Sequence, residues 1–304
     1  CGFKNHICHK KVMEDVKMND YVILTDSSCD LPDDIVKKYQ LEILQLDFIV
    51  EGEGSFHNDQ ADIGKVYSKL RNGANIKTSA ANISQASETI EALFNQKKDI
   101  LYLGFSSGLS STYQTVYMAG QELMEEYPER KMISVDTLAA SMGQGLLVYK
   151  ACQAKDAGKS LEENAQYIED IKLKLCHWFT VDDLFFLKRG GRISGVTATV
   201  GTMLSIKPIL HVDDEGHLIN VSKVRGRKSA ITELVNRMEK LAVHPEDQDI
   251  FISHGDCIED AEKLASIIKE RFGNDRITIS YVGPVIGAHS GPGTLALFFL
   301  GEHR

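Results

Sequence analysis

The stretch that most constrains the fold of this chain covers residues 99–114 and reads DILYLGFSSGLSSTYQ. Its first half is a short apolar run, long enough for a strand buried on both faces. The Ser-Ser-Gly sequence at 106–108 interrupts this run, and apolar side chains then recur at helical spacing from Leu109 onward. A strand that turns through small hydroxyl residues into a helix directs backbone N–H groups and hydroxyls at one place, which suits an anion. The stretch therefore predicts an anion-binding strand–turn–helix unit.

Similar units recur on both sides of this stretch. We expect strands at 21–25, 43–50 and 132–135, a loop at 51–60, and helices that open at 30–32, cover 61–71, follow a turn at 76–82, and end near 126 and 157. Repeats of this length indicate a parallel sheet flanked by helices, in which ligands bind beyond the carboxyl ends of the strands. Polar residues that follow these strands would share one rim: Asp26, Ser27, Ser106, Ser107, Asp136 and Thr137.

The second half of the chain has a different pattern. Segments 207–212 and 217–221 predict a β-hairpin, and helices are expected at 229–241 and 258–272 beside strands at 250–253 and 277–282. A hairpin mixed with helices indicates an α+β domain. We therefore expect a mobile leader over 1–20, an N-terminal α/β domain over 21–175 and a C-terminal α+β domain over 176–304.

Charge and composition exclude several classes of protein. A formal net charge of −9 over 304 residues argues against a general nucleic-acid binder. No apolar stretch approaches the roughly 20 residues needed to span a bilayer, and residues 1–20 lack the apolar core of a signal peptide. The six cysteines are scattered, which favours reduced thiols in a cytoplasmic protein. Cys1, His6, Cys8 and His9 match no common zinc spacing, so we expect no metal site.

One short motif suggests an enzyme. The sequence GFSSG at 104–108 fits the G-x-S-x-G nucleophile elbow, in the strand-to-helix setting that the elbow requires. Asp136 and His289 follow it in the order of a hydrolase triad, although no oxyanion segment of the HGGG type precedes it. A serine esterase that uses Ser106, Asp136 and His289 is therefore an alternative hypothesis.

Two further features point to recognition of an anion. His289 lies in the sequence AHSGPG, where Gly and Pro indicate a loop, and a loop imidazole can donate to an anionic ligand or simply to a carbonyl. A basic cluster stands out in this acidic chain: Lys188, Arg189, Arg192, Lys223, Arg225, Arg227 and Lys228. Such a cluster is either a solvated face or a docking site for phosphate or an acidic partner, and its glycine-rich KRGGR setting favours docking.

As a set, these pieces resemble the DegV family, a bacterial group of two-domain lipid-binding proteins. The matching motifs occur in order from about residue 20: TDS at 25–27, TS at 78–79, SSGLS at 106–110, TYQ at 112–114, Asp136, SMGQG at 141–145, VDDL at 181–184, LKRGGRI at 187–193, KP at 207–208 and AH at 288–289. The family usually has Gln-Pro where this chain has Ala80-Ala81, and often Ser-Gly-Thr where it has Ser110-Ser111-Thr112. Both changes leave the hydroxyl donors in place.

The resemblance implies a two-domain fold that holds one long-chain fatty acid, such as palmitate, stearate or oleate, between its domains. The carboxylate would be held by the hydroxyls of Thr78, Ser79, Ser106 and Ser107 and by His289. It further implies a carrier without catalysis or cofactor, which presents the acid to a separate fatty acid kinase for phospholipid synthesis. Arg192 and Arg225 would then contact the kinase or a phosphate. Transient contact with a membrane would accompany such a role.

Elementary energetics agree with a lipid ligand. Burying about 15 methylenes at roughly 0.8 kcal/mol each supplies on the order of 12 kcal/mol before binding costs. A buried carboxylate needs converging donors, because an unpaired buried charge is prohibitive. Candidate residues for the wall around the acyl chain, each of which could equally be ordinary core, are Phe179, Phe185, Val200, Met203, Leu204, Ile206, Ile286 and Phe298.

Overall fold

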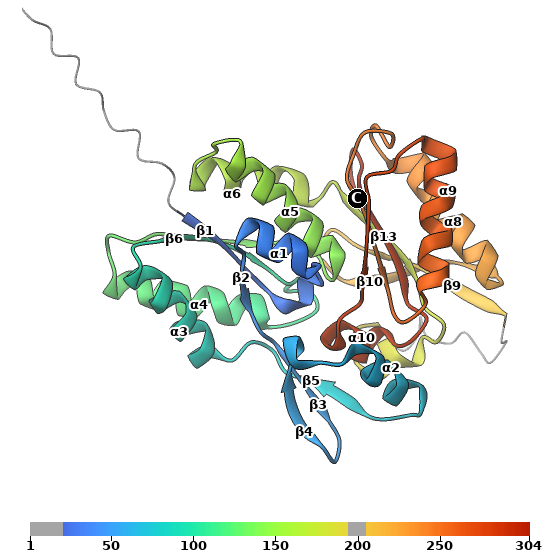
Figure 1. The fold of residues 1–304 in the computed structure, drawn as a ribbon, viewed down its shortest axis with the longest axis horizontal. Coiled ribbons are helices and arrows are strands. Elements are labelled where there is room, and N and C mark those ends of the chain that lie inside the picture. The colour runs from blue at the N-terminus through green and yellow to red at the C-terminus, as the bar shows by residue number, and fades with distance from the viewer. Residues whose placement is uncertain (1–20, 194–204) are drawn as a thin grey trace, which may run out of the picture.

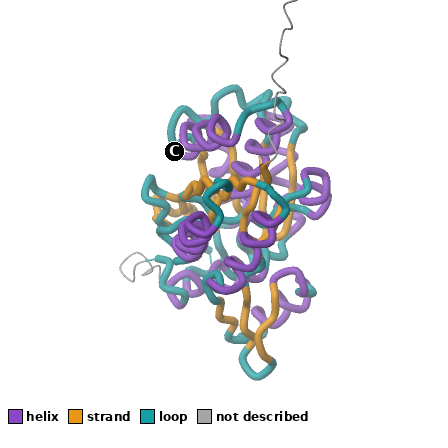
Figure 2. The backbone as a smooth tube through the Cα atoms, turned by 90° about the vertical axis from the view of Figure 1, so that its left-hand side faces the viewer, coloured by secondary structure: helices purple, strands orange, loops and turns teal. Residues whose placement is uncertain are grey.

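The computed structural model of the chain describes residues 21–193 and 205–304. Within them the strands form a four-stranded parallel sheet, a six-stranded mixed sheet and a small three-stranded sheet. Figure 1 shows the two larger sheets side by side, with the small sheet at one end of the molecule. Figure 2 shows the same arrangement from the side, with the small sheet protruding. The predicted α/β architecture of a parallel sheet with helices and a second, mixed domain is confirmed.

The parallel sheet contains the strand of the strand–turn–helix unit predicted at residues 99–114. Its strand order is β2 (Glu42–Leu44), β1 (Tyr21–Asp26), β6 (Asp99–Gly104) and β7 (Met132–Asp136). Nearly all side chains of β1 and β6 are buried. Because successive side chains of a strand point to opposite faces of the sheet, both faces of these strands are covered. One face packs on α3 (Ile83–Asn95) and α4 (Thr112–Glu126). The other packs on α1 (Asp33–Tyr39), α5 (Met142–Asp156) and α6 (Leu161–Lys172).

The mixed sheet lies against the far side of α5. Its order is β10 (Leu218–Arg225), β9 (Ile206–Val212), β8 (Leu175–Thr180), β13 (Leu295–Leu300), β11 (Ile250–His254) and β12 (Ile277–Tyr281). Its outer face packs on α8 (Arg227–Leu241) and α9 (Ile258–Phe272), while its inner face joins the core around α5. The expected hairpin is present as β9 and β10. Strand β13 occupies a central position that the sequence reading did not anticipate.

Four local expectations were wrong. The strand expected over 43–50 is two strands: β2 belongs to the parallel sheet, whereas β3 (Asp47–Val50) belongs to the small sheet. The loop expected over 51–60 contains β4 (Gly54–His57), and the turn expected over 76–82 begins with β5 (Ile76–Thr78). The short strands β4 and β5 are stable because each pairs with β3, which also packs on α2 (Ile63–Arg71). His289 lies in a short helix, α10 (Pro284–Ser290), rather than in a loop.

Domain limits and the leader keep the status of predictions. The strands of the parallel sheet fall within 21–136 and those of the mixed sheet within 175–300, so a boundary near 175/176 is compatible with the sheets. The leader expected over 1–20 lies outside the described residues. A short helix, α7 (Phe185–Arg189), follows β8. In the described part of the chain, no helix is long and apolar enough to cross a membrane.

Candidate fatty-acid site

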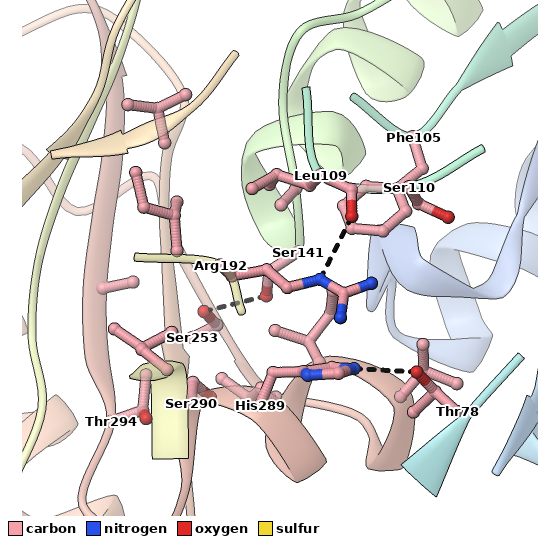
Figure 3. Close-up of a pocket in the computed structure, with 18 of the residues that line it drawn as sticks. Thr78, Phe105, Leu109, Ser110, Ser141, Arg192, Ser253, His289, Ser290 and Thr294 are labelled. Atoms are coloured by element: carbon pink, nitrogen blue, oxygen red, sulfur yellow. Dashed lines mark hydrogen bonds between the residues drawn. The ribbon is translucent and has the colours of Figure 1, made fainter. Parts of the chain in front are cut away.

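A cavity of about 310 Å³ lies between the two larger sheets. This volume is at the lower end of the roughly 300–1,000 Å³ that small-molecule sites span. Side chains from both halves of the chain form the wall of this cavity, which is mainly apolar. The apolar residues of the wall include Leu46, Phe105, Leu109, Phe179, Ile286 and Phe298. Figure 3 shows the polar groups that interrupt this wall, including Thr78, Arg192 and His289. The cavity therefore combines an apolar interior with a few polar positions.

His289 and Thr78 form a hydrogen-bonded pair in the wall of the cavity. The Nε2 atom of His289 lies 2.7 Å from the Thr78 hydroxyl oxygen, a contact that joins α10 to β5 (Figure 3). Burial, together with the positive charges of Arg192 and Arg189, lowers the pKa of His289 to about 4. The imidazole is therefore neutral at physiological pH, and either its N–H or the threonine O–H is donated in this contact.

Arg192 brings a positive charge to the same region. Its Nε donates to the Leu109 carbonyl at 3.2 Å and its Nη1 donates to the Gly190 carbonyl. Figure 3 shows the guanidinium between Leu109 and His289, directed into the cavity. Burial lowers the pKa of Arg192, yet guanidinium stays charged at any physiological pH. In the described part of the chain, the hydrogen bonds of Arg192 go to backbone carbonyls and not to a carboxylate.

The structure brings some of the predicted head-group residues together and separates others. Thr78, Ser79 and His289 line the cavity, but Ser106 and Ser107 are not among the described residues that do. The hydroxyl of Ser106 is fully buried and donates to the Gly216 carbonyl at 2.9 Å, whereas Ser107 is exposed. The structure therefore does not place these two serines in the cavity wall. Their place in the cavity wall is taken by Ser110 and Ser111, which lie further along the same turn.

The residues of the alternative esterase hypothesis do not form a triad. Ser106 donates to Gly216, and His289 contacts Thr78. The Asp136 carboxylate accepts two backbone N–H groups at 3.2 and 3.1 Å. Among the described hydrogen bonds, none joins two members of the proposed triad, although nucleophile and base must be hydrogen-bonded for this chemistry. The geometry does not support an esterase.

Asp26, at the rim of the parallel sheet, has hydrogen-bond partners within the N-terminal half of the chain. The fully buried carboxylate of Asp26 accepts from the Phe105 N–H at 3.0 Å, the Gln144 amide at 3.2 Å and the Ser28 hydroxyl. Burial is the main cause that raises the pKa of Asp26, against the effect of these hydrogen bonds. Of these groups, only Asp26 was among the residues expected at the rim.

A second hydrogen-bonded chain crosses between the two sheets. The hydroxyl of Ser141 contacts Asp30 at 2.5 Å and the Ser253 hydroxyl at 3.1 Å, and both serines line the cavity (Figure 3). Burial raises the pKa of Asp30 to about 7, with the Asp26 charge adding to the rise and hydrogen bonds from Ser141 and the Gly283 backbone opposing it. This chain joins the turn after β1 to strand β11.

Some of the residues expected in the wall around the acyl chain line the cavity, and others do not. Phe179, Ile286 and Phe298 line the cavity as expected, whereas Phe185 is 57% exposed and Ile206 is not among the lining residues. Val200, Met203 and Leu204 fall outside the described residues. Arg225 is exposed at the end of β10, away from the wall.

Metal binding finds no support in the described part of the chain, where no group of three or more His, Cys, Asp or Glu side chains is placed to hold an ion. Cys1, His6, Cys8 and His9 lie outside it. The sequence analysis took Arg192 as a contact for a kinase or a phosphate and did not expect it in the cavity wall. It also missed His177, a histidine within an ordinary strand pattern that gives no local signal for a cavity.

Comparisons with known proteins agree with this geometry. The family profile described as "Uncharacterised protein, DegV family" matches residues 20–302. A DegV domain-containing protein of Clostridium perfringens is 47% identical over 94% of this chain and 99% of its own length.

Two solved structures share both fold and family. A fatty acid binding DegV family protein from Streptococcus agalactiae is 28% identical, with a TM-score of 0.81 over 93% of this chain and 99% of that one. A DegV family protein from Thermus thermophilus, described by its fatty acid binding, is 27% identical, with a TM-score of 0.82 and the same coverage. The chain therefore belongs to the DegV family.

Proposed function

We propose that this protein binds one long-chain fatty acid in the cavity between its two larger sheets, with the carboxylate at the His289–Thr78 pair. The observation that carries the proposal is an apolar cavity whose wall holds this neutral pair beside the Arg192 guanidinium. The relatives from Streptococcus agalactiae and Thermus thermophilus, both described as binding fatty acids, support the same class of ligand.

The head group would be held by one charged and several neutral donors. When Nε2 of His289 carries the proton, it donates to the oxygen of Thr78, and the threonine hydrogen is then free to donate to a carboxylate. Arg192 supplies the positive charge that a carboxylate needs in a partly buried site. The hydroxyls of Ser79, Ser110 and Ser111 line the same cavity and complete the set of donors. The set leaves out Ser106 and Ser107, because neither lines the cavity.

The acyl tail would supply most of the affinity. About 15 methylenes at roughly 0.8 kcal/mol each give on the order of 12 kcal/mol, from which the costs of association are subtracted. The wall matches this demand with aromatic and branched side chains from both sheets, such as Phe105, Phe179 and Phe298. The head group then fixes the orientation of the acid, and the tail determines how tightly it binds.

The first test is direct extraction of lipid from the purified protein. Protein expressed in bacteria is denatured, extracted and examined by mass spectrometry. We expect a C14–C20 fatty acid in a near-stoichiometric amount. Protein that emerges empty, and that also takes up no palmitate, stearate or oleate when these are added, would refute the proposal.

The second test uses variants of the head-group site. Thr78→Val and His289→Phe each remove a polar contact to a charged group, so we expect roughly tenfold or greater weakening of palmitate binding. Ser107→Ala is the matched control, because this exposed serine belongs to the same sequence motif and does not line the cavity. Equal weakening by Ser107→Ala, or none by the other two, would show that the carboxylate lies elsewhere.

Presentation of the bound acid to a separate kinase stays a prediction, as does contact with a membrane. The proposal involves no catalytic step by this chain and no cofactor. The prediction that a kinase receives the bound acid is supported by the position of Arg192 in the cavity wall. The exposure of Arg225, Lys188 and Arg189 on the surface supports it further. Reconstitution with a candidate kinase and labelled ATP would show acyl phosphate formation that is lost in Arg225→Ala. Wild-type kinetics in that variant would remove Arg225 from the interface.

A further inference from the structure

Gly190 lies directly against the ring of His289. It follows the last residue of α7, in the KRGGR sequence that also contains Arg192. A methyl group added to Gly190 would lie 2.3 Å from the Nδ1 atom of His289. Packed side chains do not approach a neighbouring atom so closely. With the ring in its present position, residue 190 therefore has room only for glycine.

The backbone of Gly190 gives no other reason for a glycine. Its φ of −71° and ψ of −11° fall in the right-handed helical region, which any residue adopts. Gly191 is the opposite case, because its φ is +71° and no described neighbour lies within 4 Å of the place of its missing side chain. Gly191 therefore allows the turn, whereas Gly190 leaves space for the His289 ring.

The contact with His289 lies along one defined direction. The place of the missing methyl group is 2.3 Å from Nδ1 and almost equally far, 3.2 and 3.3 Å, from the ring atoms Cγ and Cε1 on either side of it. These three distances put it close to the ring plane, on the outward axis along which Nδ1 carries either a hydrogen or a lone pair. Nδ1 is buried and has no hydrogen-bond partner among the described residues. Gly190 thus lies where an acceptor for an Nδ1 hydrogen would have to be.

This contact decides which nitrogen of the neutral ring carries the hydrogen. A hydrogen on Nδ1 would meet the Cα–H group of Gly190 and would lack an acceptor, which is costly for a buried N–H. A lone pair on Nδ1 instead faces a C–H group, which is a weak donor. A hydrogen on Nε2 is donated to the Thr78 oxygen at 2.7 Å. The hydrogen-bond network therefore favours the Nε2 tautomer.

We propose that Gly190 is a positioning residue for the head group of the bound acid: it closes off Nδ1 of His289, keeps the ring hydrogen on Nε2, and so makes the Thr78 hydroxyl a donor to the carboxylate. The same residue holds a second donor, because its carbonyl accepts a hydrogen bond from Nη1 of Arg192. Gly190 is thus in contact with two of the groups that surround the head group. The inference rests on the proposed fatty-acid function and deepens it.

The first test determines the tautomer in lipid-free wild-type protein. Long-range ¹H–¹⁵N NMR of histidine-labelled protein at neutral pH distinguishes protonated from unprotonated ring nitrogens, and His289→Phe identifies the signals of His289. We expect a hydrogen on Nε2 and none on Nδ1. A hydrogen on Nδ1 would overturn the inference, and it would do so independently of lipid binding, because no ligand is present.

The second test compares two ligands that differ only in the head group. The affinities for palmitate and for hexadecanol, which has the same chain without a carboxylate, are measured by calorimetry. We expect Gly190→Ala to weaken palmitate binding roughly tenfold or more and hexadecanol binding less than about twofold, because the added methyl group displaces the ring from Thr78. Gly64→Ala is the matched control, since Gly64 is exposed on α2 and a methyl group there would meet only Asp62, at 3.5 Å. Equal weakening of both ligands by Gly190→Ala would overturn the inference.

A double variant separates the ring from other routes. In His289→Ala the ring that Gly190 contacts is absent, so the addition of Gly190→Ala should weaken palmitate binding no further. A further tenfold loss would show that the methyl group acts elsewhere, and would overturn the role assigned to Gly190. Wild-type protein that binds no palmitate would refute the proposed function, whereas the tautomer of the lipid-free protein still decides whether Gly190 fixes the ring.

Discussion

The substitution Asp30→Asn tests whether a buried carboxyl group is held in its neutral form between the two sheets. Asp30 is 9% exposed, lies 2.5 Å from the Ser141 hydroxyl and receives a hydrogen bond from the backbone of Gly283. Its backbone is left-handed, with φ at +52°. Asparagine tolerates that conformation and has the shape and polarity of a protonated aspartic acid. The variant therefore removes the ionisation and leaves the packing intact.

The size of the effect follows from the change in pKa. Burial raises the pKa of Asp30 from 3.8 to about 7 in the folded protein. Because the folded state holds the proton more tightly, its stabilising effect is fully present below the unfolded pKa and is lost as pH rises through the folded pKa. The difference of about three pKa units corresponds to about 4 kcal/mol of unfolding free energy, lost between about pH 4 and pH 8.

The assay is urea unfolding at half-unit steps from pH 5 to pH 8, followed by fluorescence. Trp178 is the single tryptophan, is 5% exposed and stacks on His211 at 4.4 Å, so it reports directly on the mixed sheet. We expect wild-type stability to fall with a slope near 1.4 kcal/mol per pH unit up to about pH 7 from this group. Asp30→Asn should lack that part of the slope and be the more stable protein at pH 8.

The control and the refuting result are both simple. Asp34→Asn removes an exposed carboxylate from the same segment and should leave the slope unchanged. Asp26 is also buried with a raised pKa, so the variant is expected to retain a slope of the same sign from that group. If wild type and Asp30→Asn show parallel pH dependence, Asp30 is ionised in the folded protein and the reasoning from burial is wrong.

Three further predictions address packing and ligand binding. Gly143→Ala would place a methyl group 2.5 Å from the His177 ring, and should lower the urea unfolding free energy by about 1–3 kcal/mol; an unchanged midpoint would contradict the close contact. Arg304 donates to four backbone carbonyls across both halves of the chain, so Arg304→Ala should lower the Tm by several degrees, with Arg304→Lys restoring only part. The pKa of His289, about 4 in the free protein, should rise when palmitate binds, because a nearby carboxylate favours the charged ring. An NMR titration that shows no rise would place the carboxylate elsewhere.

The fold was predictable where one segment carries its own pattern. The strand that begins at Asp99 is apolar throughout and is followed by a turn and a helix, so its burial and its parallel partners follow from local rules. The segment over 43–50 shows the limit of such rules. Gln45 and Asp47 interrupt its apolar pattern, and its two ends pair with different sheets. Which sheet each end joins depends on partners distant in sequence, and no local pattern encodes that choice.

Candidate site residues could be predicted from the sequence where they belong to a recognisable motif. Thr78 and His289 come from separate motifs and are in contact, as expected of a shared head-group site. Ser106 was expected there because it follows a strand end, and strand-end hydroxyls are usually free to bind ligands. Here its hydroxyl is occupied by the hairpin loop at Gly216, whose φ of +80° and lack of a side chain allow the close approach. Whether a rim hydroxyl faces a ligand or a second domain depends on the docking of that domain.

Polar residues that follow the parallel strands also connect the two halves of the chain. Ser106 reaches Gly216, and Ser141 joins Asp30 to Ser253, so polar groups after the parallel strands bind the mixed sheet. These contacts join the two halves of the chain, and those of Ser141 and Ser253 lie in the cavity wall. A residue can therefore be essential for lipid binding without touching the lipid. Ser106→Ala should weaken the interface first, and its effect on affinity should scale with its effect on unfolding free energy. Thr78→Val should lower affinity by more than its effect on unfolding free energy accounts for, because Thr78 lines the cavity.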